Sequence, residues 1–84
     1  MSMVILADCL VLSVDEFERL TRGLAELDRL YDAVRHCEQL GLEPLARVAA
    51  GAARILVTEL EAFLGGPENL DLAVFAIACG EVTR

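Results

Sequence analysis

The sequence predicts a mainly α-helical protein: an antiparallel hairpin of two long helices, with apolar N- and C-terminal segments packed on it. Three observations support this fold class. A capping-box pattern opens a heptad-like apolar repeat over residues 14–40, an almost wholly apolar segment follows over residues 45–64, and Gly41 and Pro44 mark a short link between them. Because a short link forces two long helices to lie antiparallel, the two segments should pack side by side.

The first helix should begin after Ser13, whose hydroxyl can accept from the Glu16 amide while the Glu16 carboxylate reaches back to the Ser13 amide. Its apolar seam steps by three and four residues in turn: Phe17, Leu20, Leu24, Leu27, Tyr31 and Val34. The strict repeat then fails at Glu38, and Leu30, Cys37 and Leu40 continue it on the neighbouring side. Such drift favours a globular hairpin over a long coiled coil. Gly23, in mid-helix, would admit close approach of another helix.

The second helix has almost no polar face. Its polar positions and one glycine form a thin stripe at helical spacing: Arg47, Gly51, Arg54, Thr58 and Glu61. A helix that is apolar nearly all round must be covered on several sides, either by the ends of its own chain or by another protein. The residues expected to meet the seam of the first helix are Leu45, Val48, Ala52, Ile55, Phe63 and either Leu56 or Leu60.

The two end segments are harder to assign. Residues 3–12 are apolar except for Asp8, and their length suits a strand or a short buried helix. Pro67 and Gly80 bracket a helix over residues 68–79, which its alanines favour. The alternative is a β-α-α-β chain in which residues 70–79 form a strand and pair antiparallel with residues 3–12. A two-stranded sheet is marginal alone, so that alternative implies a dimer that joins sheets.

Size and charge limit the possible functions. The 84 residues suit one small domain spanning residues 1–84, with a net charge of −7 and no lysine. This charge disfavours direct binding of nucleic acid, which needs clustered lysine and arginine. No stretch reaches the roughly 18 apolar residues that would cross a bilayer, so no membrane association is expected. Three widely spaced cysteines, with no CxxC motif, predict a reducing, cytoplasmic compartment.

No motif predicts an enzyme, a cofactor or a metal site. His36 and Cys37 are adjacent, so on a helix they point about 100° apart and cannot form a catalytic dyad. A zinc site built from His36 and the cysteines Cys9, Cys37 and Cys79 would lack the short ligand spacings of structural sites. The carboxylates Glu26, Asp28 and Asp32 are interpreted as a solvated acidic face.

The function expected from these patterns is protein–protein interaction by a small acidic module, such as an adaptor, a small chaperone subunit or an inhibitor. It would act as a homodimer, with acidic residues steering a larger partner that has a basic surface. The alternative is an acidic mimic of nucleic acid that blocks a DNA- or RNA-binding protein. The candidate interface residues are Leu24, Leu27, Tyr31, Val48, Gly51, Ala52, Ile55, Leu56 and Phe63, and the acidic face is Glu26, Asp28 and Asp32.

Overall fold

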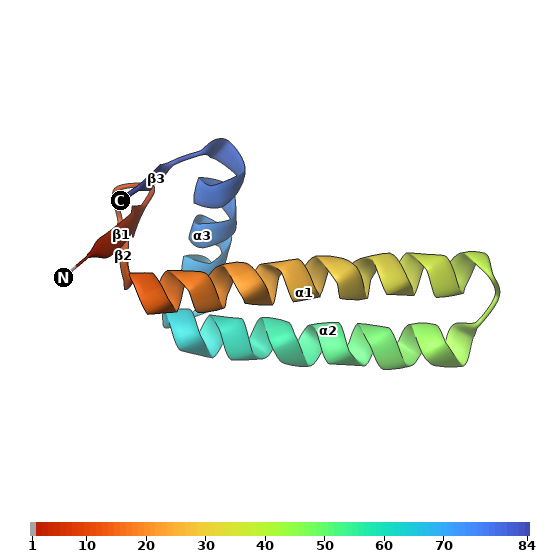
Figure 1. Ribbon diagram of the computed structural model, residues 1–84. Helices are drawn as coiled ribbons and strands as arrows, with labels where there is room; N and C mark the ends of the chain where they lie inside the picture. The colour runs from red at the N-terminus through yellow and green to blue at the C-terminus, as the bar shows by residue number, and fades with distance from the viewer. Residues whose placement is uncertain (1) are drawn as a thin grey trace.

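The computed structural model describes residues 2–84 as three helices and a small sheet (Figure 1). The elements, in chain order, are β1 (Met3–Leu6), β2 (Leu10–Ser13), α1 (Val14–Gln39), α2 (Glu43–Leu64), α3 (Pro67–Cys79) and β3 (Val82–Thr83). Helices α1 and α2 run side by side as an antiparallel hairpin, and α3 and the sheet gather at its open end (Figure 1). The predicted helical hairpin with packed end segments is confirmed.

The start of α1 follows from its capping residues. The Glu16 amide donates to Ser13 Oγ at 3.1 Å, and the Ser13 amide donates to Glu16 Oε1 at 2.9 Å. Two backbone donors that the helix cannot satisfy internally are thereby paired. The predicted capping box is therefore present, and α1 begins one residue after Ser13.

The capping box makes the stability of the protein depend on pH. Hydrogen bonds from the backbone and the hydroxyl of Ser13 lower the pKa of Glu16 from its ordinary value of 4.5. Because the folded-state pKa is lower, the stabilisation is fully present above about pH 4.5 and is lost as the pH falls through the folded-state value. Glu16→Gln keeps a capping side chain but removes this titration, so its unfolding free energy should depend less on pH in the acid range.

Urea unfolding at a series of acidic pH values measures this dependence. Glu18→Gln is the matched control, because the Glu18 carboxylate makes no hydrogen bond to Ser13. A Glu16→Gln profile parallel to that of the unchanged protein would show that the capping box carries no such linkage.

Glycine and proline set the limits of the other helices. Gly41 lies in the left-handed region at φ 73°, where it follows the end of α1, and the Leu42 amide donates to the Cys37 carbonyl at 2.8 Å. Gly80 ends α3 in the same way at φ 74°. Pro44 and Pro67 occupy the first turns of α2 and α3, where a missing N–H costs nothing. The sequence-based prediction of all three helices is confirmed to within two residues at each end.

The N-terminal segment is a β-hairpin, which the sequence left undecided between strand and helix. Strand β1 pairs antiparallel with β2 on one side and with β3 on the other, in the order β2-β1-β3. The chain reverses at Ala7 and Asp8, which both have positive φ, at 52° and 56°. The two-stranded alternative is wrong about residues 70–79, which are helical, and the third strand, β3, was not anticipated.

The core occupies the open end of the hairpin, where it joins the sheet to the three helices. Its buried members are Val4, Leu6, Leu12, Phe17, Leu20, Leu60, Leu64, Leu70, Ala73 and Ala76. Beyond α3 the hairpin projects alone, which gives the molecule an elongated shape of 48 × 22 × 20 Å (Figure 1). In that projecting part the buried side chains are alanines only, Ala46 and Ala53. Large apolar side chains there are therefore left at the surface.

Candidate interaction surface

One side of α2, outside its buried positions Ala46, Ala53, Leu60 and Leu64, is apolar and exposed. Its large side chains follow helical spacing, with exposed fractions of 56% for Leu45, 71% for Val48 and 63% for Ile55. Ala52 lies between them and is exposed as well. We call these four residues the α2 outer stripe. The ends of the chain pack against the base of the hairpin and leave this stripe uncovered (Figure 1).

The expected seam between the two long helices is wrong for these four residues. The stripe was predicted to meet α1, but the buried positions of α2 are Ala46, Ala53, Leu60 and Leu64. Because α2 is apolar on nearly every side, its pattern does not distinguish the face that packs from the face that is exposed. In the projecting part of the hairpin, the small Ala46 and Ala53 on the packed face allow α1 to approach closely, and the larger residues are left outside. Of the other expected seam residues, Leu56 and Phe63 are half-buried and Leu60 is buried.

A second apolar surface lies where α3 meets α1. Leu24, Leu27 and Tyr31 of α1 line an open groove of about 300 Å³ together with Val74 and Ile77 of α3. Tyr31 remains 48% exposed at the end of this groove. These three predicted interface residues therefore lie together, but on a different side of the hairpin from the α2 outer stripe.

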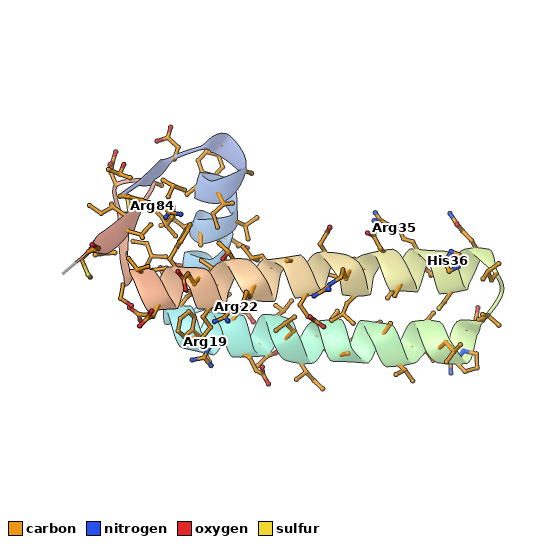
Figure 2. The ribbon with its side chains drawn as sticks, in the orientation of Figure 1. Arg19, Arg22, Arg35, His36 and Arg84 are labelled. Atoms are coloured by element: carbon orange, nitrogen blue, oxygen red, sulfur yellow. The ribbon has the colours of Figure 1, made fainter. Side chains whose placement is uncertain are left out.

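Gly51 and Phe63 belong to neither group. Gly51 is half-buried, and a methyl group added to it would meet no atom within 4 Å. Phe63 is half-buried near the open end, where the Arg19 guanidinium lies over its ring, 4.8 Å from the centroid (Figure 2). Leu56 also lies outside both groups, in a groove between α1 and α2, so the nine predicted interface residues do not form one surface.

The acidic residues of α1 are exposed but do not form one face. Glu26 pairs with Arg29 at 2.9 Å, and Asp32 pairs with Arg35. Asp28 lines the groove beside α3, whereas Glu26 lines a groove between α1 and α2. Exposed pairs of this kind contribute about 0–1 kcal/mol each. A mimic of nucleic acid would need carboxylates spaced like phosphates on one surface, and this dispersed arrangement gives no support to that alternative.

The residues with nucleophilic or metal-binding chemistry are also dispersed. Cys37 lies in the last turn of α1, next to His36 (Figure 2), whereas Cys9 lies in the turn between β1 and β2 and Cys79 is the last residue of α3. All three thiols are free. Within residues 2–84, no group of three or more His, Cys, Asp and Glu side chains could hold a metal ion.

The outer face of the sheet is an apolar surface that the sequence analysis missed. Met3 and Val11 are 44% and 51% exposed. Ile5 of β1 pairs with Val11 of β2, so its side chain lies on the same face of the sheet. An antiparallel sheet usually has polar residues on its solvated face. The sequence does contain a signal of this apolar face, because residues 3–12 form a nearly continuous apolar run in which apolar and polar residues do not alternate.

Comparison with known proteins adds nothing to this geometry. No protein-family model matches the chain, and neither curated proteins nor solved structures give a significant match. In the part of the chain that the structure describes, no helix is both long and apolar enough to cross a membrane.

Proposed function

We propose that this protein is a small protein–protein interaction module, and that it works by burying the α2 outer stripe against another polypeptide. The observation that carries the proposal is the exposure of Val48 and Ile55, which leaves two large apolar side chains in water about two turns apart on the same side of α2. Apolar patches that extend over several turns of a helix are characteristic of interaction sites. An adaptor, a small chaperone subunit and an inhibitor are the roles that such a surface would serve.

The charge distribution supports the same surface. Between Pro44 and Thr58 the charged residues are Arg47 and Arg54, although the whole chain carries a net charge of −7. The acidic excess therefore lies outside the α2 outer stripe and keeps the free protein soluble. Acidic residues of α1 would then steer a partner with a basic surface, in keeping with an electrostatic effect on the rate of association.

Site-specific photo-crosslinking tests the proposal. A photoreactive amino acid at Val48, in the full chain expressed in its source cells, should give a discrete crosslinked protein product. The matched control is the same amino acid at Ala25, an exposed position on the polar side of α1. Equal products at both positions, or none at Val48, would count against α2 as the interaction surface. The product is informative whether it contains a second copy of the chain or another protein.

A further inference from the structure

On one side of the projecting part of the hairpin, both helices contribute apolar residues. On α1 the residues of this face are Leu30, Ala33, Cys37 and Leu40, which step by three, four and three. On α2 they are Leu45, Ala49, Ala52 and Leu56, which step by four, three and four. We call these eight residues the hairpin face. Leu30, Ala52 and Leu56 line one open groove of about 320 Å³ between the two helices, together with Ile55 of the α2 outer stripe.

The charges at this groove lie at one end only. Glu26 and Glu59 border it on the side toward the sheet. From there to the closed end of the hairpin, the α1 and α2 positions of the face are apolar or cysteine. A partner for this face must therefore be apolar and must avoid the two carboxylates.

We propose that the occupant of the hairpin face is a second copy of this chain, and that two hairpins pack face to face with their sheets at opposite ends to form a four-helix bundle. This proposal rests on the proposed function but uses a neighbouring surface: the hairpin face shares Leu45 and Ala52 with the α2 outer stripe and leaves Val48 and Ile55 outside the dimer interface. A two-fold interface must be complementary to itself. The α1 row has this property, because its order of large, small, small and large side chains is the same in both directions.

We call the arrangement with the two sheets at opposite ends heads-apart. In this arrangement, α1 of one copy lies antiparallel to α1 of the other. Leu30 of one copy then lies opposite Leu40 of the second, and Ala33 lies opposite Cys37. The two small residues at the centre permit close approach of the helices, and the leucines pack at either side. This is the geometry that antiparallel helix pairs in four-helix bundles adopt.

Charge decides between the two possible orientations. If both sheets lay at the same end, α1 of one copy would lie over α2 of the other, and Glu26 would face Glu59 of the second copy at two symmetric positions. The like charges of Glu26 and Glu59 disfavour this arrangement, although the ion pair of Glu26 with Arg29 weakens the repulsion. The heads-apart orientation moves all four carboxylates beyond the closed end of the facing hairpin. α3 does not obstruct either orientation, because it packs on the side of α1 that carries Leu24 and Tyr31.

The size of the face predicts a weak dimer. About 14 residues of overlap at 1.5 Å per residue, across two helices each about 10 Å wide, give a footprint of roughly 20 by 20 Å. This footprint, about 400 Å² per partner, is roughly half of the 800 Å² per partner that stable specific interfaces commonly bury, so the dimer should be weak and should form only at high protein concentration. We therefore choose a concentration range that would detect a dissociation constant from about 1 µM to about 1 mM.

Light scattering of the full chain tests self-association, with samples spanning about 1 µM to about 1 mM. We expect the mass to rise from monomer to dimer across this range. Ala33→Arg should raise the dissociation constant by roughly 30-fold or more, because each dimer would bury two unpaired charges. Ala25→Arg is the matched control and should leave the dissociation constant unchanged, since Ala25 lies outside the hairpin face. Circular dichroism confirms that both variants are folded.

Crosslinking through the native Cys37 tests the orientation. In a Cys9→Ser, Cys79→Ser background, a short bifunctional maleimide should join the Cys37 residues of two copies, since both lie near the two-fold axis in the heads-apart dimer. Ala33→Arg should abolish this product. A dimer by mass without the Cys37 crosslink would overturn the heads-apart arrangement. A monomer at every concentration would overturn self-association altogether. In that case, a different protein captured by photo-crosslinking at Val48 would still support the proposed function as an interaction module.

Discussion

Leu20→Ala should lower the free energy of unfolding by about 3–5 kcal/mol, at the upper end of the range for leucine truncation. Leu20 has an exposed fraction of 0% and lies in the core where α1, the sheet and the base of the hairpin meet. Its removal leaves a cavity that this small core cannot fill. An 84-residue domain has a total stability of about 4–13 kcal/mol at roughly 0.05–0.15 kcal/mol per residue. The substitution would therefore remove a large share of the stability.

Urea unfolding followed by circular dichroism, with dilute protein, measures this loss. The matched control is Leu40→Ala, because Leu40 is the C-cap residue of α1, at the closed end of the hairpin, and is 59% exposed. The control should change the unfolding free energy by no more than about 0.5 kcal/mol. Similar losses for the two variants would mean that the core does not lie at the open end of the hairpin.

Leu60→Ala should lower the free energy of unfolding by about 2–5 kcal/mol, and it should also reverse the effect of a second substitution, Gly23→Ala. A Cβ atom on Gly23 would lie 2.7 Å from Cδ2 of Leu60, closer than van der Waals contact allows. In the unchanged protein, Gly23→Ala should therefore cost about 1–2 kcal/mol, because overpacking outweighs the gain in helix propensity. Once Leu60 is truncated, the same alanine should stabilise the helix by about 0.5–1 kcal/mol.

A double-mutant cycle of the four proteins measures this coupling from urea unfolding. Gly51→Ala is the matched control, since Gly51 is in mid-helix and a Cβ atom there meets nothing within 4 Å. It should raise the unfolding free energy by about 0.5–1 kcal/mol in either background. Additive effects of Gly23→Ala and Leu60→Ala would show that the two residues do not pack against one another.

Local signals predicted the helices well because each limit depends on a few neighbouring residues. Ser13 and Glu16 form a hydrogen-bonded pair within one turn, and Gly41 and Gly80 adopt a conformation that other residues rarely take. None of these interactions needs a distant part of the chain. The antiparallel hairpin follows from the short link between two long helices.

Local signals failed where several faces of one element were equally apolar. The face of α2 that packs on α1 carries Ala46 and Ala53, while the larger Val48 and Ile55 are outside. Hydrophobicity would place these residues the other way round. The N-terminal run likewise did not indicate its reversal, because Ala7 and Asp8 adopt positive φ without a glycine in the turn.

By itself, the sequence determined the helical hairpin, the limits of its helices and an apolar excess on α2 that one partner helix cannot cover. The tertiary structure alone decided which surface of α2 stays exposed. The reason is that packing depends on how closely backbones can approach, as at Gly23 against Leu60, and on where the chain ends dock. With α3 and the sheet at the open end, the apolar surface of the projecting hairpin is left for another polypeptide, and a second copy of this chain is the one we propose.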